Sequence, residues 1–510
     1  MLPSVSDLIF IALLASLVFT PLSVKLLGDA GIGWHIRTGQ LIVASHSIPR
    51  LDPFSSQLYK SWIAWEWMYD VIVGRLEIFA GLNGVVWLTA VVIAAVFAGV
   101  FRLLVARGTN LFVALFLVLL AVSASTIHFL ARPHVLSWVF TLAWFWILDS
   151  TEPAPFRRSE HRRRIWILPF FMLVWVNVHG GFLLGFVLLG IYWLGSVWTW
   201  FATSDNRIEN LLQKMSAGQR AKELALVGLV SAIASLINPY GWKLHAHIYS
   251  YLTNRFLMDH IDEFQSPNFH GIAPQCFLAL LLIGFAVVIA RGRGLGIARG
   301  LTLLFAVYAG LSASRNIPIA SILLVLLIGP QFIELDTHFS RRMTVVDSAL
   351  RGHSWPIFAI ILTLAIAAHG GRVGSSHLMD AHFDPKRMPV DAVRFLQQQN
   401  VRGPILSPDY WGGYLIYRLY PHDRVVIDDR HDFYGEAFLR SYVTMLHVDP
   451  GWDEFLKGRA ACLVLARSSA LAAIIAKSPQ WKVLSSDNVA IVFVPTEPAS
   501  DSDRAPSEGI

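Results

Sequence analysis

Residues 85–105 have the sequence VVWLTAVVIAAVFAGVFRLLV, and Arg102 is the only charged side chain in this stretch. A helix needs about 20 apolar residues to cross the hydrocarbon core of a bilayer, which is the length of this run. A second apolar run, LFVALFLVLLAVSASTI at residues 111–127, follows after a short connection that contains Arg107. Two such runs joined by a basic turn predict a pair of membrane-crossing helices.

The composition of the whole chain agrees with a membrane protein. Of 510 residues, 55% are hydrophobic and 15% are charged, and the mean hydropathy is +0.53. These values exclude an ordinary soluble enzyme, a disordered chain and a fibrous protein. The formal charge of +6 comes from arginines between apolar runs, so it indicates membrane topology and not a nucleic-acid partner. Two cysteines, Cys276 and Cys462, are too few for a disulfide framework or a zinc cluster.

Eleven apolar runs are candidate spans, which predicts a polytopic α-helical membrane protein with about eleven transmembrane helices: residues 8–27, 85–105, 111–127, 135–148, 165–178, 182–201, 224–237, 277–290, 301–311, 318–333 and 355–368. The first run also resembles a signal peptide. However, the preceding MLPSVSD has no Lys or Arg, and no small-residue cleavage site follows, so a retained helix is favoured.

The distribution of Lys and Arg predicts the orientation. With a cytoplasmic N-terminus, the inner loops contain about twice as many Lys and Arg residues as the outer loops. The most basic inner loop contains Arg157, Arg158, Arg162, Arg163 and Arg164. We therefore expect a multi-pass protein of the bacterial inner (cytoplasmic) membrane, with its C-terminal region outside the cytoplasm.

Polar residues return after the last apolar run, so the chain divides into a transmembrane domain, residues 1–369, and an extracytoplasmic α/β domain, residues 370–497. Apolar periodicity predicts the elements of the α/β domain. The expected helices are 390–399, 411–419 and 438–446, and the expected strands are 404–406, 425–427, 462–465, 482–484 and 489–494. Residues 486–488 suit a hairpin turn, and residues 498–510 have the composition of a flexible tail.

A long outer loop, residues 28–83, follows the first predicted span. Its segments around Trp34 to Ile42 and from Trp62 to Phe79 suit short amphipathic helices at the membrane interface. The tryptophans at 62, 65 and 67 also suit an ordinary aromatic belt, but a belt does not explain Asp29, Glu66 and Asp70 beside them.

Asp29 is the first candidate for a catalytic residue. A carboxylate at the mouth of a partly desolvated cavity can take a proton from an acceptor hydroxyl while that oxygen attacks an electrophile. The alternative is a turn aspartate or a solvated charge. Glu66 is a candidate second acid, or an ion-pair partner for Arg37. No His, Asp or Glu spacing here is a recognised zinc motif, and a divalent metal is left open.

Cationic and imidazole side chains occupy the same predicted outer face: His35, Arg37, Arg132, His134, His179 and Arg315. Guanidinium groups present paired donors to phosphate oxygens and stabilise the charge of a departing phosphate. These residues are therefore candidates for binding a phosphate-linked donor. The alternative for Arg132 and Arg315 is snorkelling to the interface, and for the histidines it is ordinary packing.

Several motifs together resemble a known superfamily. GWHIRTGQ, IPRLDPFS, AWEW, ARPH, NVHGGF, NPYG, WGGYLIYRL and VVIDDRHDFYG are similar to blocks in a group of bacterial membrane proteins placed near the GT-C superfamily of polyprenyl-phosphate-sugar-dependent glycosyltransferases. The resemblance spans most of the chain. It implies inverting transfer of a sugar from a polyprenyl-phosphate carrier to a cell-envelope glycan, lipid or protein at the outer membrane face.

The resemblance also implies a role for Asp29, which corresponds to the catalytic acid in the first outer loop of the superfamily. Many members have a paired-acid motif there, whereas Asp29 is followed by Ala30 and Gly31. This departure leaves Glu66 or Asp70 as substitutes for the base, and it leaves metal dependence open.

The C-terminal domain contributes candidate acceptor-binding residues: Trp411, Tyr414, Asp428, Asp429, Arg430 and Tyr434. The aromatic rings suit stacking on sugar faces, and acids after a strand lie where open α/β sheets bind ligands. The alternative is that Asp428 pairs structurally with Arg430 and that Gly412 and Gly413 allow tight helix packing. No GxGxxG motif precedes a helix, which favours a lipid-linked donor over a soluble nucleotide sugar.

Two other classes of protein remain as alternatives. A transporter or flippase of a lipid-linked substrate would place charges near mid-membrane and contain discontinuous helices, for which NVHGGF is the one suggestive segment. The third class is a non-catalytic scaffold that presents the outer domain. A groove open to lipid near Asp29 would favour transfer chemistry, and a pore would favour transport.

Overall fold

The computed structural model describes residues 2–57, 60–152, 159–204, 207–291, 295–335, 338–350 and 352–496. Arg157 and Arg158 of the predicted basic loop and the predicted tail at 498–510 lie outside these ranges. The chain forms two compact units. The helical unit is Met1–Leu17, Trp87–Phe129 and Pro133–Ala365, and the mixed unit is Val18–Val86, Leu130–Arg132 and Ile366–Ile510.

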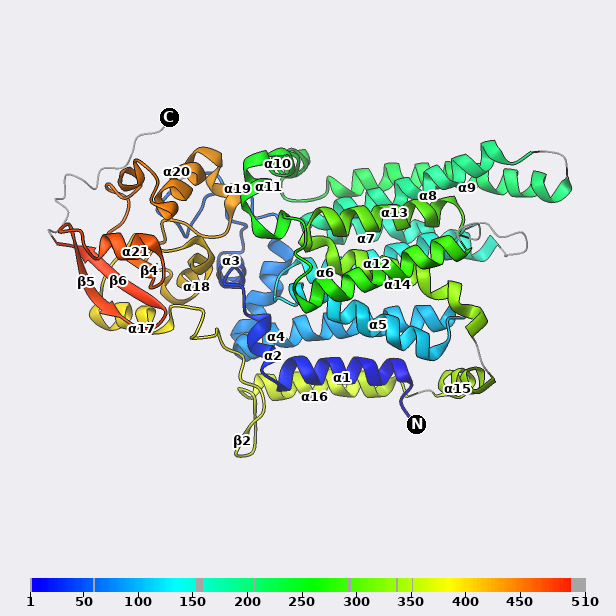
Figure 1. Cartoon of the computed structure of the whole chain (residues 1–510), viewed down its shortest axis with the longest axis horizontal. Coiled ribbons are helices and arrows are strands. Elements are labelled where there is room, and N and C mark those ends of the chain that lie inside the picture. Colours follow the sequence, from blue (N-terminus) through cyan, green and yellow to red (C-terminus); the bar gives the residue numbers. More distant parts are fainter. Residues whose placement is uncertain are drawn as a thin grey trace. The chain divides into compact units, whose positions relative to one another are not determined.

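The helical unit is a bundle (Figure 1). Its helices are α5 (Leu111–Ser125), α6 (His134–Ser150), α7 (Leu168–Trp175), α8 (Leu183–Ala202), α9 (Ile208–Ser235), α10 (Trp242–Thr253), α11 (Arg255–His260), α12 (Ile272–Arg291), α13 (Ile297–Ser312), α14 (Ile317–Ile328) and α15 (His338–Ala349). Most of α1 (Val5–Phe19) and of α16 (Ser354–Ala368) and the second half of α4 (Trp67–Ala106) also belong to it.

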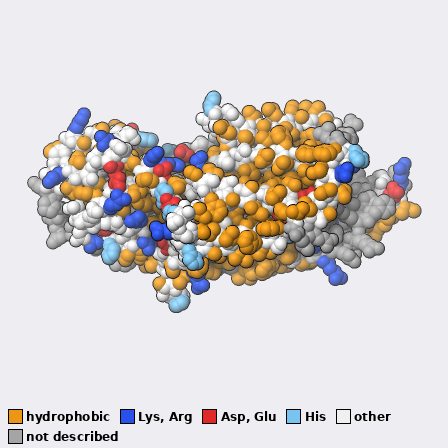
Figure 2. Space-filling model, turned by 90° about the horizontal axis from the view of Figure 1, so that it is seen from below, with side chains coloured by type: hydrophobic (Ala, Val, Ile, Leu, Met, Phe, Trp, Pro, Cys, Tyr) orange, Lys and Arg blue, Asp and Glu red, His pale blue; other side chains and the backbone are white. Residues whose placement is uncertain are grey.

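Helix α14 is the core of this bundle. Its residues are apolar on every side, and nearly all of them are buried, as expected for a helix surrounded by other helices. The outer helices instead expose large apolar side chains, including Phe201 (73% exposed) and Phe285 (66% exposed). Figure 2 shows hydrophobic side chains gathered over the bundle. Such a surface suits contact with lipid and not with water.

The chain is a multi-pass integral membrane protein, with fewer candidate spans than the eleven expected. Among the described residues, five helices are long and apolar enough to cross a membrane, or six if α15 and α16, bent by 62°, form one span. The difference arises because several of the helices that form in these runs, such as the 8-residue α7 and the 16-residue α13, are shorter than the roughly 20 residues that cross the hydrocarbon core.

The mixed unit combines the long first loop with the C-terminal region. Its further elements are α2 (Leu22–Leu26), α3 (Ile32–Ser45), β1 (Arg372–Val373), β2 (Ser376–His377), α17 (Val390–Gln399), β3 (Ile405–Leu406), α18 (Asp409–Leu419), α19 (His431–Tyr434), α20 (Glu436–His447), β4 (Cys462–Ala466), α21 (Ala470–Ile475), β5 (Trp481–Ser486) and β6 (Ala490–Pro495). The predicted helices of the C-terminal region are confirmed, whereas α19 and α21 were not expected.

A four-stranded mixed sheet of order β3-β4-β6-β5 forms the centre of the C-terminal region. Strands β3 and β4 are parallel, and the other neighbouring pairs are antiparallel. The predicted strand at 425–427 forms only isolated bridges, in which Val425 lies between Ile405 and Ser55. The first loop therefore extends the edge of this sheet through Ser55. Asp428 and Asp429 come directly after the Val425 segment at this edge.

Two glycine contacts explain how α3 and α18 approach each other. A Cβ atom on Gly413 would lie 2.2 Å from the Ala30 carbonyl oxygen, and one on Gly33 would lie 2.1 Å from the Gly413 carbonyl oxygen. Gly412 lies equally close to the backbone of Asp428. The paired glycines of WGGY therefore allow tight backbone packing, which is the structural alternative considered for them.

The helices expected in the first loop are present. Helix α3 covers Trp34 to Ile42, and α4 begins at Trp67 and bends at Gly81, whose φ is +61°. However, α3 is not an exposed interfacial helix, because Trp34, Ile36 and Ile42 are buried together with the polar His35 and Thr38. Its surroundings within the mixed unit are protein on both the apolar and the polar sides.

Candidate functional site

Asp29 lies in the short connection between α2 and α3. Its Oδ1 atom accepts a hydrogen bond from the Gly31 amide at 2.8 Å, a local turn that an aspartate commonly makes before a helix. The carboxylate remains 29% exposed. The turn thus fixes one oxygen of Asp29 and leaves part of the carboxylate accessible.

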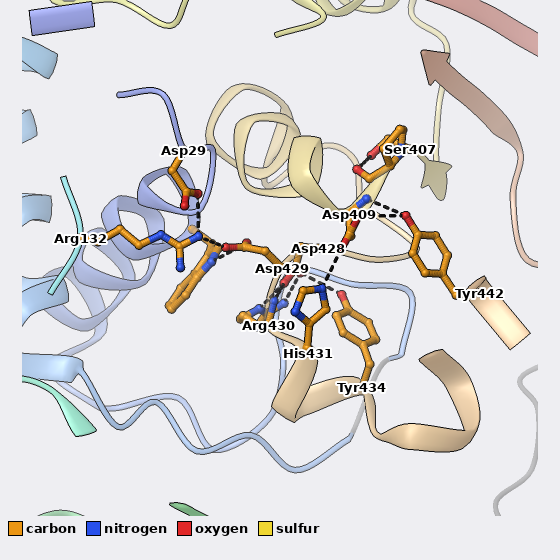
Figure 3. Close-up of polar contacts among 12 residues, drawn as sticks. Asp29, Arg132, Ser407, Asp409, Asp428, Asp429, Arg430, His431, Tyr434 and Tyr442 are labelled. Carbon is orange, nitrogen blue, oxygen red and sulfur yellow. Dashed lines mark hydrogen bonds and ion pairs between the residues drawn. The ribbon is translucent and has the colours of Figure 1, made fainter. Parts of the chain in front are cut away.

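Arg132 contacts Asp29 because the residue before Arg132 is hydrogen-bonded to the end of α2, just before the connection that contains Asp29. The Ala131 amide donates to the Leu26 carbonyl at 2.7 Å, at the end of α2. Arg132 Nη2 then donates to Asp29 Oδ1 at 2.6 Å and also to Asp429 Oδ2 (Figure 3). One guanidinium nitrogen therefore joins two carboxylates that are far apart in sequence. We call Asp29, Arg132 and Asp429 the Asp29 cluster.

Asp429 reaches this cluster from the end of the Val425 segment. Its Oδ1 accepts from Trp34 Nε1 at 3.0 Å, and the side chain is 13% exposed. Burial raises the pKa of Asp429 to about 6; the Arg132 charge opposes this shift, and the charges of Asp29 and Asp428 add to it. A carboxyl with this pKa exchanges its proton near neutral pH.

Gly31 provides the space for this arrangement. A Cβ atom there would lie 2.3 Å from Asp429 Oδ2 and 2.5 Å from Arg132 Nη2. Any side chain at position 31 would therefore require these two groups to shift.

A second arginine lies beside the Asp29 cluster but is completely enclosed. Arg430 pairs with Asp52 at 2.8 Å and with Asp428 at 2.7 Å, and Tyr434 donates to Asp428 at 2.8 Å. The Arg430 guanidinium lies 4.7 Å from the centre of the Trp62 ring. Burial opposes ionisation of Asp52, but the Arg430 charge and the hydrogen bonds from Arg430 and Ser55 together outweigh it and lower the pKa of that carboxyl. This buried network attaches the first loop to the C-terminal region.

A pair formed by an aspartate and a histidine lies at the start of α18. His431 Nε2 contacts Asp409 Oδ2 at 2.7 Å, and Tyr442 donates to Asp409 Oδ1 at 3.1 Å (Figure 3). The sequence interpretation did not single out this pair. The available signal was that Asp409 follows one predicted strand and His431 follows the next, so both were expected at the same sheet edge.

The predicted phosphate ligands of the first loop are engaged with protein. His35 is buried, with Nδ1 at 2.6 Å from Asp70 and Nε2 at 3.8 Å from Glu66. Arg37 does not pair with Glu66 as considered; its Nε donates to the Tyr417 carbonyl at 2.9 Å. The expected second acid, Glu66, therefore faces the imidazole of His35.

The remaining predicted phosphate ligands belong to the helical unit, each with its own contacts. His134 Nε2 donates to the His128 carbonyl at 3.0 Å. His179 Nδ1 accepts from the Ser137 hydroxyl at 2.8 Å. Arg315 lies 3.1 Å from Glu263. Their role toward a phosphate stays a prediction.

The predicted acceptor ligands are mostly interior residues. The side chains of Trp411, Tyr414 and Tyr434 are buried, and Trp411 Nε1 donates to the Arg387 carbonyl at 2.8 Å. Stacking on a sugar requires an open ring face, which these rings do not present in this structure. Of the six residues, Asp429 is the one that joins the Asp29 cluster.

The arrangement of donors does not fit a metal site. Within the described part of the chain, no group of three or more His, Cys, Asp or Glu side chains could hold a metal ion. In the Asp29 cluster, the two carboxylates instead flank the Arg132 guanidinium. We therefore derive no step of the chemistry through a metal.

The fold of the chain is similar to that of solved membrane-protein structures. Solved structures with this fold match most of the chain. They include ArnT from Cupriavidus metallidurans bound to undecaprenyl phosphate, with 13% identity, a TM-score of 0.51, and coverage of 98% of this chain and 99% of that one.

Two structures of the oligosaccharyltransferase from Archaeoglobus fulgidus match as well. The complex of AglB with an inhibitory peptide and a dolichol-phosphate has 11% identity, a TM-score of 0.56, and coverage of 90% and 69% of the two chains. The form tethered with an acceptor peptide has 12% identity, a TM-score of 0.52, and coverage of 90% and 68%. No protein-family model and no curated protein sequence matches the chain. These likenesses define the fold.

Proposed function

We propose that this protein is a GT-C-type glycosyltransferase that moves a sugar, with inversion, from a polyprenyl-phosphate-linked donor to a cell-envelope glycan, lipid or protein. The observation that supports this most is the position of Asp29. It directly follows the first apolar helices, stays partly exposed, and has its charge balanced by Arg132. The structural neighbours bound to undecaprenyl phosphate and to dolichol-phosphate support the class of donor.

Asp29 is the proposed general base. Among the described residues, its hydrogen bonds involve Oδ1, so Oδ2 is the atom assigned to the proton. The acceptor oxygen attacks the anomeric carbon while its proton passes to Asp29. The bond between that carbon and the phosphate oxygen breaks, and the lipid phosphate departs with the electron pair.

Charge on the departing phosphate requires cations. Arg37, His134, His179 and Arg315 keep this proposed role, together with His35. Arg132 is a weaker candidate than the sequence suggested, because its guanidinium already donates to two carboxylates. Placement of the reaction on the outer face of the bacterial inner membrane follows from the loop charges and is part of the same proposal.

The test is turnover of a panel of polyprenyl-phosphate sugars by the purified full-length protein in lipid nanodiscs. We expect Asp29→Asn to reduce turnover by about 100-fold to 10,000-fold, the usual contribution of a general base. Asp391→Asn is the matched control, since Asp391 forms an exposed surface pair with Arg394. Equal rates for wild type and Asp29→Asn would remove Asp29 from the base role, and donors that bind but are never consumed would refute the transferase.

A further inference from the structure

The Asp29 cluster contains one carboxylate more than an ion pair needs. Asp29 and Asp429 both accept from Arg132 Nη2, although Arg132 and Asp429 are 297 positions apart in the chain. With both acids ionised, the three side chains together carry one negative charge. The C-terminal region supplies this second carboxylate.

The second carboxylate changes what Arg132 does to Asp29. An arginine that pairs with one aspartate favours the ionised form and makes that carboxylate a poorer proton acceptor. When the same nitrogen also donates to another carboxylate, the positive charge is shared, and the two like charges favour uptake of a proton.

The two acids are not equivalent in geometry. Both oxygens of Asp429 are engaged, Oδ1 by Trp34 and Oδ2 by Arg132, and its side chain is the less exposed of the two. Asp29 retains the more accessible carboxylate. Asp29 is thus better placed to meet an acceptor, and Asp429 is better placed to hold Arg132.

We infer that Asp429 is a positioning residue of the catalytic centre, which holds Arg132 between two carboxylates and thereby keeps Asp29 able to accept a proton from the acceptor. This inference rests on the proposed function. Burial raises the pKa of Asp429 to about 6, and the facing charges are those of Arg132, Asp29, Asp428 and His431. Above about pH 6, Asp429 is therefore ionised and shares the positive charge of Arg132 with Asp29.

The pH dependence of kcat/KM tests the inference. In Asp429→Asn, Arg132 is left with Asp29 alone, so we expect the acidic limb of the profile to move to lower pH by about 1 to 3 units. The plateau should fall by roughly tenfold, because the base is weaker. Asp429→Glu should restore both, and Asp391→Asn should leave the profile unchanged.

Three results would overturn the inference. In the first, Asp429→Asn is as inactive as Asp29→Asn, the acidic limb of its pH profile is at the wild-type position, and Asp429→Glu does not restore activity. This result would make Asp429 the base. In the second, Asp429→Asn behaves as wild type. In the third, Asp429→Asn loses activity because it no longer elutes as a folded protein on size-exclusion chromatography, and the folded variant Gly31→Ala has the same acidic limb as the wild type. Gly31→Ala places a Cβ atom 2.3 Å from Asp429 Oδ2 and 2.5 Å from Arg132 Nη2 without removing a charge, so we expect both groups to shift and the acidic limb to move in the same direction as in Asp429→Asn.

A readout without turnover separates this inference from the proposed function. Infrared difference spectra of the full-length protein with carboxyl-labelled aspartate should show a protonated carboxyl that disappears with a midpoint of about 6. The signal should be absent in Asp429→Asn and should have a lower midpoint in Asp29→Asn, because the like charge is gone. If the wild-type protein shows this infrared signal but turns over no donor, the proposed function is refuted. If it turns over a donor but shows no such signal, the inference is refuted.

Discussion

The adjacent acids Asp428 and Asp429 show how two identical residues acquire different roles. Asp428 is fully buried against Arg430, and removal of that arginine would leave both Asp428 and Asp52 without their cation in the interior. Asp429 points instead to Arg132, which is 24% exposed. Both acids were predicted to bind an acceptor. The structure assigns Asp428 to a stabilising network and brings only Asp429 to the Asp29 cluster.

The Asp409–His431 pair predicts a pH-dependent stability. Burial opposes the charge on each group, but their hydrogen bond, their opposite charges and the other polar groups around them together outweigh it, which raises the pKa of His431 above 6.5 and lowers the pKa of Asp409 below 3.8. The contribution of His431 is complete below its unfolded pKa and is lost as the pH rises through the folded pKa. That of Asp409 is complete above its unfolded pKa and is lost as the pH falls through the folded pKa.

We therefore expect His431→Gln to destabilise the protein by about 1 to 3 kcal/mol at pH 5.5 and by less at pH 9, in line with hydrogen bonds to charged groups. Thermal unfolding of the full-length protein at both pH values measures this. His382→Gln is the control, since His382 is an exposed residue of the same unit. An equal loss of stability at both pH values would contradict the assigned pairing.

At the scale of elements, the contact between α3 and α18 decides where the Asp29 cluster forms. Helix α3 begins just after Asp29 and carries Trp34, and α18 meets it through Gly33 and Gly413. The same close approach brings the connection at Ala30 against Gly413. The spacing of two helix backbones therefore sets the distance over which Asp429 can reach Arg132.

Gly413→Ala tests this contact. Alanine normally favours a helix over glycine by about 1 kcal/mol, but here its Cβ would meet a backbone oxygen at 2.2 Å, which cannot rotate away. We expect a net destabilisation of about 1 to 3 kcal/mol, as for an overpacked core. Gly190→Ala in α8 is the control, because a Cβ there meets nothing within 4 Å. A stabilised Gly413→Ala protein would disprove the tight packing.

At the scale of the whole molecule, the proposed chemistry depends on orientation in the membrane. Two of the structural neighbours are bound to undecaprenyl phosphate and to a dolichol-phosphate, and the loop charges predict the C-terminal region outside the cytoplasm. Cysteine labelling in intact cells tests this, in a Cys276→Ser background that retains the buried Cys462.

We expect Gln398→Cys, on the exposed side of α17, to react with a membrane-impermeant thiol reagent added outside. Gln213→Cys, exposed on α9 in a predicted inner loop, should react only after permeabilisation. The reverse pattern would invert the topology and would place the Asp29 cluster on the wrong side for the proposed reaction.

The amino-acid sequence by itself determined the membrane class, most of the helices and strands of the C-terminal region, and the helical segments of the first loop. These follow from hydropathy and periodicity, which are properties of neighbouring residues. The sequence suggested more spans than the five or six found among the described residues, because several of its apolar runs are shorter than a membrane span needs.

Only the tertiary structure decided which polar residues meet. Arg132 is 103 positions from Asp29 and 297 from Asp429, so no local pattern links them. Asp29 and Trp34 are brought to this contact by the segment that packs through Gly33 and Ala30 against Gly413 of α18. A site composed of side chains from distant segments is a property of packing, and hydropathy carries no information about it.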